Sequence, residues 1–467
     1  MESEEKFMKE QTSSKKIQNM TEGSPMRMIT LFALPMIFSN LFQQLYNVID
    51  SLIVGNFLGT NALAAVGNTG SITAVLVQLS TGLALGASIV ISQYFGAKRY
   101  DRIRLSATTI AIFISVLAAV LTGLMLLFAK PVLVLIQTPE EILADSVSYL
   151  RIYVLGCIPI FLYNAINGVY VSLGNSKTPL YFLLISSVTN VVLDLLFIIS
   201  FQMGVAGAAL ATVLSQVVAA VLALVDVPRL LAGFSRPQTG PHYFDRVLLM
   251  TMLKYALPAA LQQSIVSVGT VIVQATINTF GPAVIAGSAA AAKVVNLVSS
   301  VAINFSNAYS NYVGQNIGAG KQERITPGLV ASLQCCGVIS LVLTVFLELF
   351  AEDFIRMFVN DGDINEVVHI GAQYVRVVGA FMVIFAAFML LKATFKGSGD
   401  MKWFVITTLA SLFIRVGLTA GLADTVGVEM IWWSICIGWV LSLLLAVARY
   451  RQGGWRKKAI VTKAENV

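Results

Sequence analysis

Four side chains that could coordinate a small cation lie inside apolar stretches of this sequence. Asp50 lies near the end of the stretch that begins with Ala33-Leu34-Pro35, Asn190 and Asp194 lie in a second stretch, and Thr212 lies in a third. An ionisable side chain in hydrocarbon costs about 3 kcal/mol or more, so it persists only where protein or water surrounds it. Two carboxylates, an amide oxygen and a hydroxyl form a hard oxygen ligand set that suits Na+, and close carboxylates can also hold a proton.

Helical geometry predicts that these four side chains meet. Because a helix rises about 1.5 Å per residue, a helix entering near Pro179 places Asn190 roughly 16 Å and Asp194 roughly 22 Å from its start. The next helix, entering from the opposite side, places Thr212 roughly 10 Å deep. Residues four apart share a helix face. The alternative interpretation is that Asp50 caps a helix end or contacts interfacial water.

The composition predicts an all-α integral membrane protein. Of the 467 residues, 57% are hydrophobic and 12% are charged, and the mean hydropathy is +0.80. Soluble domains carry roughly 25% charged residues, and a membrane-spanning helix needs about 20 apolar residues. We expect twelve transmembrane helices near residues 29–55, 62–95, 106–128, 146–170, 179–201, 205–231, 251–280, 284–317, 327–350, 367–394, 401–422 and 428–449.

The charged residues predict the orientation of the chain. The net charge is +7, with Lys and Arg in short clusters in alternate connections and acidic residues concentrated in the others. Lys and Arg favour the cytoplasmic side, so we expect a multi-pass protein of the plasma membrane with both termini in the cytoplasm. The clusters do not suggest one basic surface, so no nucleic acid is expected as a partner. Residues 1–25 lack an apolar stretch, and we expect no cleaved signal peptide.

The sequence also contains an internal repeat. Ala33-Leu34-Pro35 returns as Ala256-Leu257-Pro258, and residues 93–103 share five of eleven positions with residues 315–325 at an offset of 222. We expect two pseudo-symmetric bundles of six helices, with the substrate path between them. The expected divisions are a tail at 1–25, a first lobe at 26–231, a cytoplasmic linker at 232–250, a second lobe at 251–450 and a tail at 451–467.

Several motifs in the expected order resemble the MATE (multidrug and toxic compound extrusion) transporters. The resemblance rests on ALP, YNVIDSLIVGN, QYFGAKRYDRI, VSLGNSKTP and GVAGAALATVLSQ, and it covers essentially the whole membrane part. It implies a MATE/MOP-type fold and a secondary active antiporter, with export of amphipathic, mostly cationic drugs or toxins in exchange for inward H+ or Na+. We expect a monomer whose partners are such cations and membrane lipid, with no cofactor beyond the coupling ion.

The resemblance also implies roles for individual residues. Asp50, Asn190, Asp194 and Thr212 match the first-lobe cation- or proton-coupling residues, with Asp50 and Asp194 as the possible Na+ ligands. NorM-like members carry further acids in the seventh and tenth helices, where this sequence has Val266 and, approximately, Phe385. The pattern therefore resembles DinF-like bacterial members, which couple through the first lobe.

Other residues are weaker candidates. Pro35 removes a backbone hydrogen bond from an apolar helix and is a candidate hinge; alternatively, it occupies a first turn, where proline costs nothing. Gln43, Tyr46 and Asn164 could line a substrate cavity, although polar side chains in membrane helices also form interhelical hydrogen bonds.

Nothing in the sequence predicts catalysis. His242 and His369 are expected in loops with no nucleophile or carboxylate pattern nearby, and there is no GxxxxGK[ST] phosphate loop, so we expect neither an enzyme nor an ATP-driven pump. A lipid-linked saccharide flippase of the same superfamily is the alternative. Such carriers tend to have more than twelve helices and a strongly cationic cavity.

Overall fold

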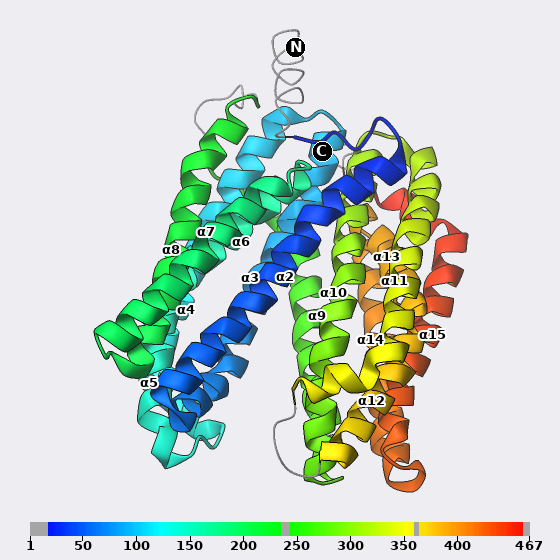
Figure 1. Cartoon of the computed structure of the whole chain (residues 1–467). Helices are drawn as coiled ribbons and strands as arrows, with labels where there is room; N and C mark the ends of the chain where they lie inside the picture. Colours follow the sequence, from blue (N-terminus) through cyan, green and yellow to red (C-terminus); the bar gives the residue numbers. More distant parts are fainter. Residues whose placement is uncertain (1–16, 235–242, 359–363, 461–467) are drawn as a thin grey trace. The chain divides into compact units, whose positions relative to one another are not determined.

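The computed structural model describes residues 17–234, 243–358 and 364–460. Within these ranges the chain forms helices and no strand (Figure 1), which confirms the all-α class. Residues 1–16 of the expected amino-terminal tail, residues 235–242 of the linker with His242, and residues 461–467 of the last tail lie outside the described residues.

Among the described residues, ten helices are long and apolar enough to cross a membrane. They are α2 (Pro25–Leu58), α3 (Thr60–Gly96), α4 (Tyr100–Leu135), α7 (Lys177–Asp194, continued by the π-helical turn η1, Leu195–Ser200), α8 (Gly204–Leu231), α9 (Arg246–Asn278), α10 (Pro282–Gly318), α11 (Ile325–Arg356), α14 (Met401–Val426) and α15 (Glu429–Gln452). Large apolar side chains stay exposed along them, as at Leu127 of α4, which is 73% exposed, and such surfaces fit lipid.

Two further spans consist of bent helix pairs. α5 (Glu140–Leu155) and α6 (Cys157–Ser172) meet at 46°, and α12 (Ile364–Ala380) and α13 (Met382–Ser398) meet at about 51°. Counting each pair as one span gives twelve, in agreement with the apolar stretches. The prediction that His369 lies in a loop was wrong, because this residue lies within α12.

The bend between α5 and α6 has a local cause, which is a proline just after the break. The Pro159 ring would clash with the carbonyl of Leu155, four residues earlier, in a continuous helix. The carbonyl of Val154, in the last turn of α5, accepts a hydrogen bond from the Thr122 hydroxyl of α4 at 2.9 Å, in addition to a backbone N–H at the helix end. The break therefore costs little, since a neighbouring helix supplies a donor for an exposed backbone group.

The second bend repeats this arrangement without a proline. The Thr344 hydroxyl of α11 donates to the Gly379 carbonyl at 2.8 Å, just before the break at Phe381. Thr344 follows Thr122 by 222 residues, the offset of the sequence repeat. The two halves thus share individual polar contacts as well as helix order.

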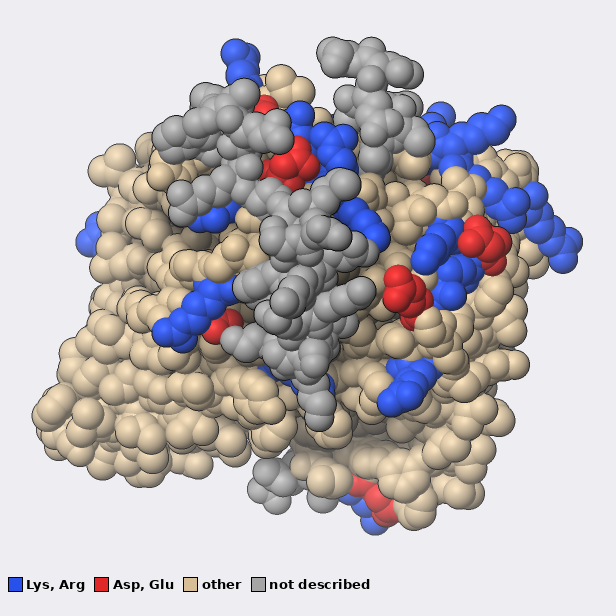
Figure 2. Space-filling view, turned by 90° about the horizontal axis from the view of Figure 1, so that it is seen from above, with Lys and Arg blue, Asp and Glu red and all other residues tan. Residues whose placement is uncertain are grey.

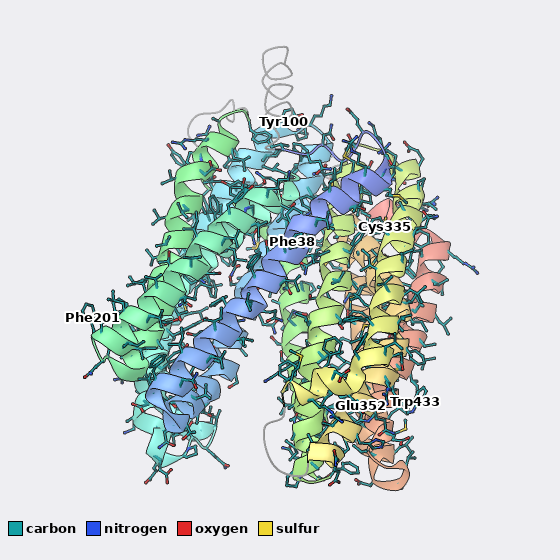
Figure 3. All side chains as sticks on the ribbon, viewed as in Figure 1. Phe38, Tyr100, Phe201, Cys335, Glu352 and Trp433 are labelled. Carbon is teal, nitrogen blue, oxygen red and sulfur yellow. The ribbon has the colours of Figure 1, made fainter. Side chains whose placement is uncertain are left out.

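The chain forms two compact units, and each takes a piece from the other half of the sequence. Unit 1 comprises the described residues before Met20 and Phe38–Ala260, and unit 2 comprises Met20–Ile37 and residues 261–460. The expected lobes assigned the first and seventh helices whole to one lobe each. The structural boundaries instead fall inside α2, next to Phe38 near the middle of this helix (Figure 3), and inside α9. Both boundaries follow Pro35 and Pro258 by two residues.

Basic residues gather at the loops that end α3, α10 and α15. These ends carry Lys98 and Arg99, then Lys321 and Arg324, then Arg449 to Lys458. Figure 2 shows Lys and Arg side chains outnumbering Asp and Glu on one face of the molecule. These basic clusters lie in connections that the sequence analysis predicts on the cytoplasmic side, and that orientation stays a prediction.

Candidate cation-coupling site

The candidate site lies in unit 1, where α2 meets the end of α7. Asp50 of α2 is half-buried and Asp194, the last α-helical residue of α7, is fully buried. Their carboxyl groups are hydrogen-bonded to each other. Because a carboxylate can only accept a hydrogen bond, this contact requires one proton shared by the pair.

A change of helix type places Asp194 at this point. The chain turns π-helical at Leu195 directly after Asp194 and stays so to Ser200. Single π-helical turns inside α-helices are rare and occur frequently at functional sites. Stacking of Phe197 on Phe201, with ring centroids 6.0 Å apart, supports the turn. Sequence periodicity contains no signal for it.

Asn190 links Asp194 to α8. With its amide in the orientation that satisfies both neighbours, its nitrogen donates to Asp194 Oδ2 at 3.2 Å and its oxygen accepts from the backbone N–H of Thr212 at 3.3 Å. The Thr212 hydroxyl donates to the carbonyl of Ala208 in its own helix, at 3.1 Å. The structure therefore brings all four predicted residues together, and Thr212 contributes a backbone group to the contact.

The pair retains unused acceptor capacity. The Oδ1 atoms of Asp50 and Asp194 are both buried and, apart from the contact between the two acids, accept no hydrogen bond from an N–H or O–H group of the described residues. A buried acceptor without a partner is costly, and a proton or a small cation would remove that cost. The described residues contain no group of three or more His, Cys, Asp or Glu that could hold a metal, so a Na+ ion here would depend on two carboxylates together with neutral oxygens.

Tyrosines surround the two acids. Tyr46 of α2 and Tyr149 of α5 lie close enough to Asp50 and Asp194 to interact with them electrostatically, and Tyr149 stacks on Tyr153 at 6.0 Å between ring centroids. The sequence interpretation placed Tyr46 in a substrate cavity and missed Tyr149 and Tyr153. The four-residue spacing of two tyrosines in an apolar stretch was the available signal.

Apolar side chains close the site around these polar groups. Ile53 and Val54 of α2 form a buried cluster with Ile198 and Val205, and Tyr149 belongs to the same cluster. A poorly hydrated environment strengthens electrostatic interactions. The energy of the two carboxyl groups therefore depends strongly on whether a proton or cation is bound.

The remaining predicted residues have varied surroundings. Pro35 is buried, ten residues after the first residue of α2, so the first-turn interpretation is wrong for it. Asn164 donates to the Ser80 hydroxyl at 2.8 Å and thereby links α6 to α3, as the interhelical alternative proposed. Gln43 is exposed. In unit 2, Phe385 is buried against Trp439, with ring centroids 4.6 Å apart.

These features define a multi-pass helical membrane protein made of two repeated halves, with a buried acid pair in the first. A MatE family model matches residues 35–196 and, separately, residues 258–420. The chain therefore belongs to the MatE family, and the two matches coincide with the internal repeat.

Known proteins resemble the chain over nearly its full length. The probable multidrug resistance protein YpnP of Bacillus subtilis is 31% identical over 457 residues, covering 96% of this chain and all of YpnP. A MOP superfamily transporter from Pyrococcus furiosus, described as having a binding pocket of reverse polarity, aligns with a TM-score of 0.87 at 23% identity, over 94% of this chain and 98% of its own. An outward-facing multidrug resistance MATE transporter aligns with a TM-score of 0.83 at 23% identity, with the same coverage.

Proposed function

We propose that the protein is a secondary active antiporter that exports amphipathic, mostly cationic drugs in exchange for inward H+ or Na+. Its family membership and its similarity to YpnP support drug export. The hydrogen-bonded pair of Asp50 and Asp194, with its buried unpartnered oxygens, is the observation that supports ion coupling. The protein works as a monomer in the plasma membrane with both termini in the cytoplasm.

The pair offers a way for an ion to change the conformation of α2. With one shared proton or a bound Na+, the two carboxyl groups hold the distal part of α2 against α7. Without either, two buried negative charges repel each other. Because Pro35 interrupts the hydrogen bonds of α2 just before the helix passes from unit 2 to unit 1, bending at that point would relieve the repulsion.

Ion and drug then compete because each binds more tightly to a different conformation of the protein. If the loaded acid pair favours the state that has released drug, each ligand lowers the affinity of the other by the same factor. A differential affinity of about 1–3 kcal/mol is the usual size of such coupling. Gln43 and Tyr46, on the same helix as Asp50, would be the residues of this helix that contact drug.

One observation favours the flippase alternative. Lys392 and Lys396 of α13 lie four residues apart in unit 2. The Lys392 ammonium lies 5.3 Å from the centre of the Phe404 ring, and Lys396 donates to Asn307 Oδ1 at 2.8 Å. The sequence interpretation did not consider Lys392 and treated Lys396 only as a charge of a cytoplasmic connection. Cations in half-buried positions such as these attract anionic groups, such as the phosphates of a lipid-linked saccharide.

Dye efflux from inverted membrane vesicles tests the proposal. We expect a Na+ gradient or a pH gradient, imposed separately, to drive accumulation of an ethidium-type dye, and the effective gradient identifies the coupling ion. Vesicles from cells without the protein are the control. Movement of a fluorescent lipid-linked saccharide, with no dye transport under either gradient, would favour the flippase.

A further inference from the structure

The repeated loop motif at 93–103 and 315–325 has a structural role that the coupling site does not explain. Both copies contain an arginine at the same position, Arg102 and Arg324. Each arginine contacts the segment that leads into the first helix of the other half of the sequence. We call these two sets of contacts clasp 1 and clasp 2.

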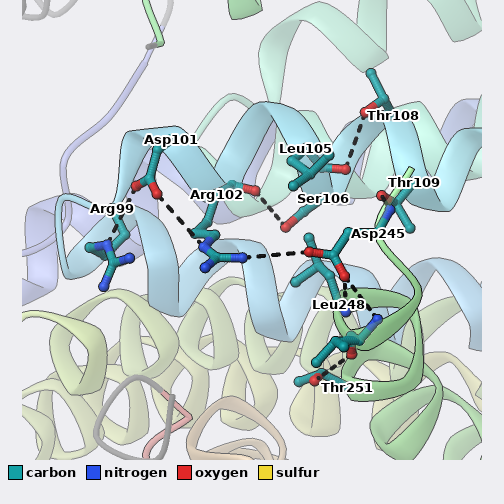
Figure 4. Close-up of polar contacts among 11 residues, drawn as sticks. Arg99, Asp101, Arg102, Leu105, Ser106, Thr108, Thr109, Asp245, Leu248 and Thr251 are labelled. Atoms are coloured by element: carbon teal, nitrogen blue, oxygen red, sulfur yellow. Dashed lines mark hydrogen bonds and ion pairs between the residues drawn. The ribbon is translucent and has the colours of Figure 1, made fainter. Parts of the chain in front are cut away.

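Clasp 1 joins Arg102 of α4 to Asp245, the residue before α9. Arg102 Nη1 lies 3.6 Å from Asp245 Oδ2 (Figure 4). The other carboxylate oxygen caps α9 by accepting from the N–H groups of Val247 and Leu248 at 2.8 and 3.0 Å. The backbone N–H of Asp245 donates to the Thr109 hydroxyl at 3.1 Å. One aspartate therefore both starts α9 and attaches it to α4.

Clasp 2 joins the α10–α11 loop to the segment Met20–Gly23 that leads into α2. Arg324 Nη2 donates to the Gly23 carbonyl at 2.7 Å, and Lys321 donates to the Thr21 carbonyl at 3.0 Å. Gln315 accepts from the N–H of Met20 at 2.9 Å, and Asn316 donates to the Met20 carbonyl at 3.1 Å. These contacts involve backbone groups, so they need no particular sequence at 20–23.

The two clasps occupy matching places. Gly23 lies twelve residues before Pro35, and Asp245 lies thirteen residues before Pro258. Further contacts attach the same helix ends: the Thr30 hydroxyl of α2 donates to Cys335 Sγ of α11 at 3.6 Å. In unit 1, a Cβ on Gly86 of α3 would lie 2.4 Å from the Cβ of Ala256 in α9, so only glycine permits this approach.

We propose that Arg102 and Arg324 are positioning residues of the transport cycle, each of which fastens the proximal end of the other half's first helix to its own unit. The clasps explain why Met20–Ile37 belongs to unit 2 and why residues 246–260 belong to unit 1. Movement between the units is then taken up inside α2 and α9, at Pro35 and Pro258. The clasps stay closed throughout the cycle and bind neither drug nor ion.

Charge reversal at clasp 1 tests this inference, which rests on the proposed export function for its transport readout. Each of the single variants Arg102→Glu and Asp245→Lys places two like charges together, and we expect the maximal rate of dye efflux to fall about fivefold, the effect of roughly 1 kcal/mol. The dye concentration for half-maximal efflux stays unchanged, because the clasps do not contact drug. The double variant restores the ion pair but not the cap of α9, so it transports faster than Asp245→Lys, which lacks the same cap.

Matched variants separate the ion pair from other effects. Arg104→Glu makes the same charge change two residues away, where the described residues contain no ion pair to Arg104, and we expect normal efflux. Asp245→Asn retains a good N-cap and loses the charge, so it lowers efflux less than Asp245→Lys does. Membrane-inserted protein is quantified for every variant.

Hydrogen exchange supplies a readout that does not depend on transport. Amides at residues 243–250 exchange faster in Arg102→Glu than in the native protein or Arg104→Glu, because the start of α9 is released. The double variant exchanges more slowly at these residues than Asp245→Lys, which lacks the same N-cap. The inference fails if the native protein exports dye while Arg102→Glu behaves like Arg104→Glu in both assays, or if the double variant shows no recovery relative to Asp245→Lys. A native protein without dye export would instead count against the proposed function. Hydrogen exchange at residues 243–250 alone would then test whether Arg102 holds the start of α9.

Discussion

The Asp50 carboxyl group is hydrogen-bonded to that of Asp194, although 144 residues separate them in the sequence. The contact joins α2, which is shared between the two units, to α7, which belongs wholly to unit 1. An ion that binds to this pair therefore acts on a helix that connects both units. The predictions below address the pair, the hinge and the repeat.

Asn190 supports the acid pair and should set its ion affinity. Asn190→Ala removes the donor to Asp194 Oδ2 and the acceptor for the Thr212 N–H. A hydrogen bond to a charged group contributes about 1.5–3 kcal/mol, so the ion concentration for half-maximal efflux should change about tenfold or more. Titration of dye efflux against Na+ and against pH measures this change. Asn164→Ala, which removes the bond to Ser80, should leave that concentration unchanged.

Pro35 should affect the rate of dye efflux and not the folding or insertion of the protein. Pro35→Ala restores a backbone hydrogen bond and stiffens α2 where it passes between the units. We expect normal insertion, normal dye binding and an efflux rate reduced about tenfold, which corresponds to roughly 1.4 kcal/mol. Pro131→Ala, inside α4 and far in sequence from a unit boundary, is the control. Equal efflux rates for the two variants would exclude the hinge.

Thr122 and Thr344 should stabilise the two bends. Thr122→Val and Thr344→Val each keep the side-chain shape and remove the hydroxyl that donates to the carbonyl of Val154 or Gly379. Interhelical hydrogen bonds in membrane proteins contribute about 0.6–2 kcal/mol, so each variant should unfold at a lower temperature in detergent. Thr81→Val, whose hydroxyl bonds within its own helix to Val77, should change the unfolding temperature less. If Thr122→Val and Thr344→Val both lowered the unfolding temperature less than Thr81→Val does, this role would be contradicted.

Much of the fold could be predicted because apolar length reports membrane spans directly. The repeat also followed from the sequence, since Gln93-to-Ile103 and Gln315-to-Ile325 agree at a constant offset. The meeting of Asp50 with Asp194 followed from their depth and their chemical type. Each of these signals is local or periodic.

The remaining features depend on contacts between distant residues. The bend beside Phe381 has no proline, and the carbonyls that it frees accept from Thr344 of α11 and Cys436 of α15. The π-helical turn after Asp194 alters hydrogen bonding without altering hydropathy. We attribute the exchange of helix ends between units to Arg102 and Arg324, which the sequence interpretation treated as loop charges and as matching positions of the repeat.

Efflux from proteoliposomes containing Asp50→Asn, Asp194→Asn or both substitutions tests the central claim most directly. Asparagine keeps the size of aspartate and removes its charge, so each single variant should insert normally and lose ion-driven dye export. Since the two acids act as one site, the double variant should be no worse than either single variant. Full ion-driven export by both single variants would contradict the account.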